Sequence, residues 1–135
     1  MRNDIIPGLC RPLVMIAALS IPGTAFALGE EIDKALEQCL DSSDGGTASM
    51  LGCMATYNEA WDRILNRNYR KSLEQASPEG KQKIRDAQRA WIAYRDKMVE
   101  AIFATGEGGS IDRLSASSFF GDETKRQAIR LRNLK

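Results

Sequence analysis

The side chains best suited to chemistry gather in the nonapeptide QRAWIAYRD, residues 88–96, where a tryptophan and a tyrosine stand among two arginines, an aspartate and a glutamine. Such a cluster could bind a ligand or take part in catalysis, or it could form the buried seam of a helix bundle. The chain has no histidine, so the commonest general base and metal ligand is missing. The sequence also has neither a nucleophile elbow nor a phosphate-binding loop.

Other candidate catalytic groups are few. Two pairs of adjacent acidic residues, 30–31 and 122–123, stand where helices are expected to begin, and there they suit the helix dipole better than acid–base catalysis. Cys39 and Cys53 alone, without histidine, make a poor metal site. The sequence therefore predicts no catalytic residue, no cofactor and no metal site, and the protein is not expected to be an enzyme.

The N-terminal residues have the pattern of a secretory leader. Arg2 and Arg11 precede an apolar run, 13–26, which leads into the small-x-small sequence Ala-Phe-Ala. A membrane anchor is the weaker interpretation, because Pro-Gly interrupts this run and a membrane span needs ~20 residues. We expect cleavage at the end of a signal peptide, 1–27, which leaves one periplasmic or secreted domain, 28–135, with no stable membrane span.

The expected mature chain is electrically balanced. Removing Arg2, Arg11 and Asp4 from the 19 basic and 18 acidic residues leaves 17 of each, so no strong field attracts nucleic acid or an anionic membrane. The remaining cysteines, Cys39 and Cys53, form an even pair, which in an exported protein predicts a disulfide. Such a disulfide would close the stretch of chain from Cys39 to Cys53 into a ring, which contributes roughly 3 kcal/mol to the free energy of unfolding.

The spacing of apolar residues predicts an all-α fold. Apolar positions recur in steps of three and four, the period of an amphipathic helix, and no stretch alternates with period two. We expect a short helix over 30–40, a Gly/Ser-rich turn over 41–49 and two long helices over 48–76 and 78–105.

The two long helices are expected to form an antiparallel hairpin whose apolar stripes face each other. Ser77 can cap the second helix, and Pro78 ends the first helix while suiting the first turn of the next. A loop over 106–121 and a terminal helix capped by Asp122 would complete the chain. The prediction is a small disulfide-stapled helical bundle built on a long antiparallel helix hairpin.

This arrangement favours a buried seam for the nonapeptide over a binding surface. The helical phase places four residues of the region on the seam: Ala87, Trp91, Tyr94 and Met98. Gln88 and Arg95 lie on its edge, whereas Arg89 and Asp96 project elsewhere. An arginine beside buried aromatic rings can lay its methylenes over them and carry its guanidinium to a carboxylate or a carbonyl.

A set of motifs spread over residues 36–131 resembles the LprI-like lysozyme inhibitor family of small exported bacterial proteins. The matching positions are Cys39 and Cys53; Leu65, Asn66 and Tyr69; Gln88, Arg89, Ala90, Trp91, Ile92, Tyr94, Arg95 and Asp96; Gly108, Gly109 and Ser110; and Thr124. The nonapeptide is the specific part of this pattern. The resemblance implies an exported helical protein whose partner is a lysozyme or another muramidase-type peptidoglycan hydrolase, which it binds and occludes.

The chain departs from the family pattern in two places. The family usually has a second cysteine pair, and here apolar residues stand at those positions: Val99 or Met98, and Phe119. The arginine that usually follows the terminal threonine by three residues is Gln127. Apolar packing could take the place of the missing disulfide.

An inhibitor of such an enzyme must fill the groove in which two carboxylates cleave the sugar chain. The candidate partner-binding loop lies within TGEGGSIDR, 105–113, where Gly108 and Gly109 allow a tight protrusion and Ser110 and Arg113 could bond to carboxylates. The same glycines also fit an ordinary helix end and turn. Because a neutral chain gains little steering toward a cationic lysozyme, the alternative is a helical periplasmic immunity or accessory protein with a different protein partner.

Overall fold

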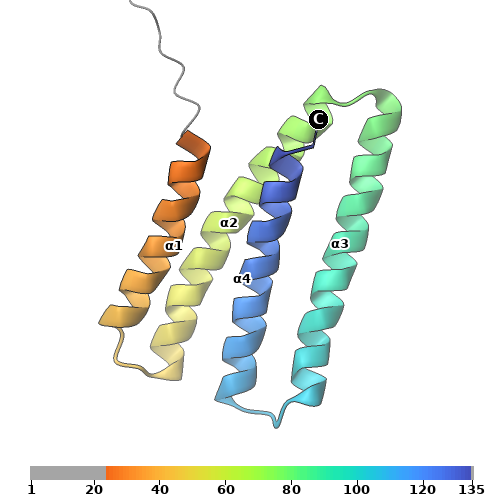
Figure 1. The fold of residues 1–135 in the computed structure, drawn as a ribbon. Coiled ribbons are helices and arrows are strands. Elements are labelled where there is room, and N and C mark those ends of the chain that lie inside the picture. The colour runs from red at the N-terminus through yellow and green to blue at the C-terminus, as the bar shows by residue number, and fades with distance from the viewer. Residues whose placement is uncertain (1–23, 135) are drawn as a thin grey trace, which may run out of the picture.

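The computed structural model describes residues 24–134, and this part of the chain folds into four helices with no strand (Figure 1). The helices are α1 (Thr24–Ser42), α2 (Thr47–Gln75), α3 (Pro78–Thr105) and α4 (Ser110–Arg132). The prediction of an all-α helical bundle is confirmed. Residues 1–23 of the expected signal peptide lie outside the described residues, and α1 runs across the expected cleavage site. Among the described helices, none is both long enough and apolar enough to cross a membrane.

Short side chains define the ends of the long helices. The Ser77 hydroxyl accepts a hydrogen bond from the Gly80 N–H at 3.1 Å, so it caps α3 as predicted. In the α1–α2 turn, the Asp44 carboxylate accepts hydrogen bonds from the Ser49 hydroxyl and from the Gly46 N–H. These two bonds, the Ser49 bond foremost, hold the pKa of Asp44 below its usual value.

The fourth helix occupies the centre of the bundle. Figure 1 shows α4 between α2 and α3, while α1 lies along the outer side of α2. Although α2 and α3 are antiparallel as predicted, their apolar stripes do not face each other directly, because α2 packs mainly on α4 and α3 packs mainly on α4 as well. The two helices of the hairpin, α2 and α3, are therefore separated by the C-terminal helix α4.

The face of α4 that meets α2 is built from small residues. Gly121, Thr124 and Ala128 recur at steps of three and four residues, and Thr124 and Ala128 are fully buried. A Cβ on Gly121 would lie 2.1 Å from the Asn58 Oδ1, so the two helix backbones approach closely at this point. Small side chains thus allow α4 to sink between its neighbours.

Two expectations for this region are wrong for the same reason. The expected loop over 106–121 is a helix from Ser110 onward, and Asp122 lies in the middle of α4 rather than capping it. The Ser- and Gly-rich sequence indicates a loop when it is read alone. In the folded chain it forms the first half of α4, in which Ala116 and Gly121 are buried, and the packing of α4 outweighs weak helix propensity.

Polar side chains of α2 tie the two central helices together. The Asn68 amide donates a hydrogen bond to the Ala128 carbonyl, and the Ser72 hydroxyl donates one to the Leu131 carbonyl, each at 2.8 Å. Asn68 and Ser72 are themselves buried. Buried polar groups of this kind specify one register of α4 on α2, because a shifted helix would leave them unpaired.

The apolar core lies where three helices meet. Its buried members are Tyr57, Trp61 and Leu65 from α2, Trp91 from α3, and Ala128 and Leu131 from α4. Near the N-terminal end of α2, the Cys39 and Cys53 sulfurs lie 2.00 Å apart, which is disulfide distance. This bridge joins α1 to α2. The α1 helix is also held by an ion pair between Asp33 and Lys125 of α4.

Candidate functional site

The nonapeptide lies mainly inside the bundle. Trp91 is buried in the core, and Gln88 is 6% exposed. The Gln88 side-chain oxygen Oε1 accepts a hydrogen bond from the Gln127 side-chain Nε2 at 3.0 Å, which links α3 to α4. Gln127, where the chain departs from the resembled family, is therefore an internal residue that holds two helices together.

Arg95 covers the aromatic side chains rather than facing a partner. Its guanidinium carbon lies 4.9 Å from the centroid of the Trp91 ring and 4.1 Å from that of the Phe120 ring. Its Nε and Nη2 groups donate to one carboxylate oxygen of Asp96, at 3.0 and 2.8 Å. The guanidinium is thus satisfied locally by stacking and by an ion pair.

Three residues placed on the seam by the sequence lie on the surface. Ala87 is exposed, Tyr94 is 49% exposed and Met98 is 37% exposed, so their assignment to the buried stripe is wrong. The physical reason is that α3 packs on one helix, α4, along most of its length, so its buried stripe is narrow. That stripe passes from Trp91 to Arg95 instead of Tyr94, whose ring meets Phe119 edge to face at 6.4 Å.

The other motif positions do not converge on a cleft. Leu65 and Thr124 are buried, and Tyr69 packs against the core. Asn66 bonds back to the preceding turn of its own helix, and Arg89 is exposed and pairs with an aspartate one turn away. The motif positions thus include both buried packing residues and residues exposed on the helix surfaces.

Sequence reasoning missed a buried carboxylate on α4. Glu123 is 5% exposed and pairs with Arg126 at 2.7 Å and with Arg130 at 3.8 Å. It was assigned to a helix start, whereas it lies well inside α4. The three- and seven-residue spacing of the two arginines places all three side chains on one helix face, and this spacing was the available signal.

Tyr57 in the core is held in its neutral form. Burial raises the pKa of the Tyr57 hydroxyl, and the carboxylates of Asp33 and Asp122 raise it further, so Tyr57 stays neutral. Within residues 24–134, no three histidine, cysteine, aspartate or glutamate side chains come together in a way that could hold a metal ion.

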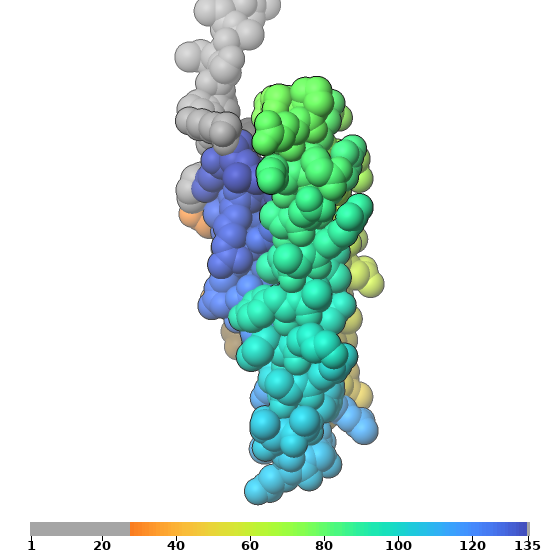
Figure 2. All heavy atoms as spheres, turned by 90° about the vertical axis from the view of Figure 1, so that its right-hand side faces the viewer, coloured from red at the N-terminus to blue at the C-terminus, as the bar shows by residue number. Residues whose placement is uncertain are grey.

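The α3–α4 turn, Gly106–Gly109, forms one end of the molecule, at the foot of the view in Figure 2. Gly108 has a φ of 76°, which favours glycine. The Asp112 carboxylate accepts hydrogen bonds from the Gly108 and Gly109 N–H groups, at 2.6 and 3.2 Å. A Cβ on Gly106 would lie 2.2 Å from that carboxylate, so the turn closes tightly around Asp112.

The turn and the first turn of α4 together carry the exposed side chains of this end. Ile111 is 77% exposed, and Ser110 and Arg113 are also exposed. Ser110 and Arg113 belong to α4 and not to a loop, which corrects the expected loop boundaries. Among the described residues, Arg113 takes part in none of the ion pairs found. We call residues 106–113 the tip.

Comparison with known proteins gives one family. The family described as Lysozyme inhibitor LprI matches residues 39–131, a span that includes both cysteines, the nonapeptide and the tip. Neither a curated protein nor a solved structure matches the chain.

Proposed function

This chain belongs to the Lysozyme inhibitor LprI family, and from that membership we propose that it is an exported protein that binds and occludes a muramidase-type cell-wall hydrolase. It acts in the periplasm or outside the cell, as a binding protein and not as an enzyme. The signal peptide, 1–27, is removed before it acts. The observation that carries the proposal is the exposed tip, 106–113.

The tip suits insertion because its shape is fixed before binding. Asp112 fastens the backbone of Gly108 and Gly109, so little conformational entropy is lost when the tip enters a groove. The ends of α3 and α4 support the turn on both sides (Figure 1). The buried residues of the family motif are needed for packing in the core. The tip is therefore the best candidate for the element that inserts into the enzyme.

The side chains of the tip match the chemistry of a muramidase groove. Such a groove holds two carboxylates that flank the scissile bond. The Arg113 guanidinium can meet one of them in a charge-assisted hydrogen bond, and the Ser110 hydroxyl can donate to the other. Ile111 supplies exposed apolar surface for the walls of the groove. Glu107 stays at the rim, where a cationic enzyme surface would receive it.

The test is inhibition of a panel of muramidases by the wild-type protein and by the double variant Ser110→Ala with Arg113→Ala. Loss of a desolvated charge pair typically costs about 2–5 kcal/mol, so we expect inhibition to weaken at least 30-fold, which is about 2 kcal/mol. The matched control is Ser118→Ala with Arg85→Ala, which removes the same two groups from exposed positions away from the tip. Circular dichroism and melting must be unchanged in both variants.

Two outcomes would contradict the proposal at different levels. If the wild type inhibits and the tip variant inhibits equally well, the tip is not the inserting element. If the wild type inhibits no muramidase, the proposed activity itself is wrong.

The second candidate function, an immunity or accessory protein with a different protein partner, is favoured by an exposed apolar pair on α3. Ile92 and Phe103 are 40% and 47% exposed, and their spacing along the helix puts them on the same side of α3. Exposed apolar side chains on one helix are typical of protein contact surfaces. Loss of partner capture by Ile92→Gln with Phe103→Gln, but not by the tip variant, would select this function.

A further inference from the structure

A basic cavity lies at the end of the bundle opposite the tip, where α2 and α4 finish and α1 begins (Figure 1). Its volume is about 430 Å³, which is within the range of small-molecule sites. Three cations line it: Arg67 and Lys71 from α2, and Arg132 from α4. Leu28 and Leu131 add apolar walls.

The residues that line this cavity include no acidic residue. Arg67 and Lys71 are exposed, and neither takes part in the ion pairs found within residues 24–134. They stand four residues apart on one helix face, where like charges repel each other. A bound anion would relieve this repulsion.

Two backbone carbonyls of α4 beside the cavity accept hydrogen bonds from α2. Asn68 and Ser72, which also line the cavity, donate hydrogen bonds to the Ala128 and Leu131 carbonyls near the end of α4. Unpaired carbonyls at a helix C-terminus carry partial negative charge and would repel an anion. Because these carbonyls are paired, an anion would meet the cationic side chains first.

Helix dipoles do not account for all three cations. Arg132 lies in the last turn of α4, where a basic residue offsets the negative end of the helix dipole. Arg67 and Lys71 lie ahead of the last turn of α2, which contains no basic residue. The helix dipole therefore does not explain why Arg67 and Lys71 line the cavity, whereas a bound anion would.

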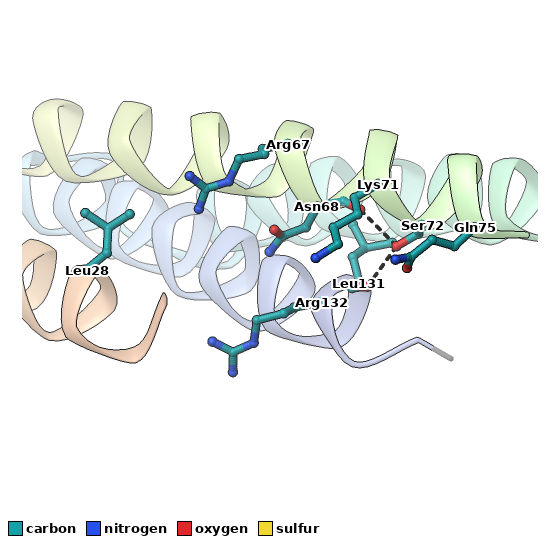
Figure 3. Close-up of a pocket in the computed structure, with 8 residues that line it drawn as sticks. All are labelled: Leu28, Arg67, Asn68, Lys71, Ser72, Gln75, Leu131 and Arg132. Atoms are coloured by element: carbon teal, nitrogen blue, oxygen red, sulfur yellow. Dashed lines mark hydrogen bonds between the residues drawn. The ribbon is translucent and has the colours of Figure 1, made fainter. Parts of the chain in front are cut away.

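We propose that this cavity binds a phosphate monoester. Figure 3 shows Arg67 and Lys71 extending from α2, and Arg132 extending from α4 on the other side of the opening. A tetrahedral dianion can take donors from both helices at once, and arginine matches its oxygens with two parallel bonds. Leu28 and Leu131 would contact the carbon part of the ester. The ester is either a free small molecule or the headgroup of a lipid.

The experiment is an NMR titration of the wild-type protein, its disulfide intact, with glycerol 3-phosphate, inorganic phosphate and succinate. We expect saturable shifts of the Asn68, Ser72 and Leu131 amides, with glycerol 3-phosphate binding most tightly. Arg67→Gln and Lys71→Gln should each weaken binding about tenfold, because each removes a charge-assisted hydrogen bond. The control Arg85→Gln makes the same charge change at an exposed arginine of α3 and should change the affinity less than about twofold.

A vesicle arm separates the two sources of the ester. Flotation with phosphatidic acid vesicles, but not with phosphatidylcholine vesicles, would assign a lipid headgroup if it is lost in Arg67→Gln and kept in Arg85→Gln. The absence of both saturable shifts and vesicle binding overturns the proposal. Tighter binding of succinate than of either phosphate overturns the ligand class. Equal weakening by Arg85→Gln shows general screening and overturns the site.

Discussion

Replacing Gly121 by alanine tests the close approach of α4 to α2. The added Cβ would lie 2.1 Å from the Asn58 Oδ1 and 2.9 Å from the Tyr57 ring, which is closer than real Cβ contacts allow. Asn58 would have to leave the hydrogen bond that it donates to the Ser117 carbonyl, or the helices would have to separate. Either response disturbs the contact through which most of α2 is buried.

The expected magnitude combines two opposing effects. Alanine in place of glycine favours a helix by about 1 kcal/mol, and overpacking a core costs about 1–3 kcal/mol. Gly121→Ala should therefore change the free energy of unfolding by about 0–2 kcal/mol in the destabilising direction. Gly52→Ala is the matched control, since Gly52 lies inside α2 with no neighbour near its Cβ position. It should stabilise the protein by up to about 1 kcal/mol.

The measurement is urea unfolding of both variants, followed by circular dichroism with the disulfide intact. The difference between the two variants isolates the packing cost because the propensity gain cancels, and it should be about 1–3 kcal/mol. Adding Asn58→Ala to Gly121→Ala removes the nearest clash, so the double variant should lose less stability than the sum of the single variants. Equal stabilisation by Gly52→Ala and Gly121→Ala would refute the close approach of α4 to α2.

Three further predictions concern other parts of the chain. Trp91→Ala should destabilise the protein by about 3–5 kcal/mol in denaturant melts, whereas Arg89→Ala, at an exposed ion pair, should cost under about 1 kcal/mol, and the reverse order would place the wrong residue in the core. Cys39→Ser with Cys53→Ser should lower the free energy of unfolding by roughly 3 kcal/mol, and an unchanged urea midpoint would argue against a linked pair in the wild type. The intact mass of exported protein should correspond to a chain that begins at Leu28, and a mass that includes the leader would contradict cleavage there.

The sequence predicted the helices that bury large side chains. Trp61, Leu65 and Trp91 recur at helical spacing, and Ser77 signals where α3 begins, so α2 and α3 could be placed. Only the second half of the central helix α4 was predicted, as a terminal helix from Asp122 onward, because its buried face is made of residues such as Gly121 and polar Thr124. Their burial depends on a neighbouring helix and leaves no apolar stripe in the sequence.

The candidate sites could likewise be predicted only where the local sequence signals them. The tip was predictable in outline because Gly108 and Gly109 mark a turn locally, although the helix start at Ser110 was not. The basic cavity was invisible, because Arg67 and Arg132 lie far apart in the chain and meet through the packing of α4 on α2. The sequence placed Trp91 correctly on the buried stripe of α3. It chose Tyr94 as the next residue of that stripe, whereas Arg95 occupies this position, and because the stripe is narrow Tyr94 lies on the surface.

The central position of the last helix has a consequence for the order in which the protein can be completed. The hydrogen bonds that tie α4 to α2 join residues 59 or 60 positions apart, whereas the disulfide between α1 and α2 spans 14 positions. A chain that emerges from its N-terminus can close the short α1–α2 unit early, but the aromatic side of α2 must wait for the final residues. Until then the core that contains Trp61 and Leu65 lacks the two buried residues that α4 contributes, Ala128 and Leu131. The C-terminal helix thus completes the burial of the core, which earlier parts of the chain cannot finish without it.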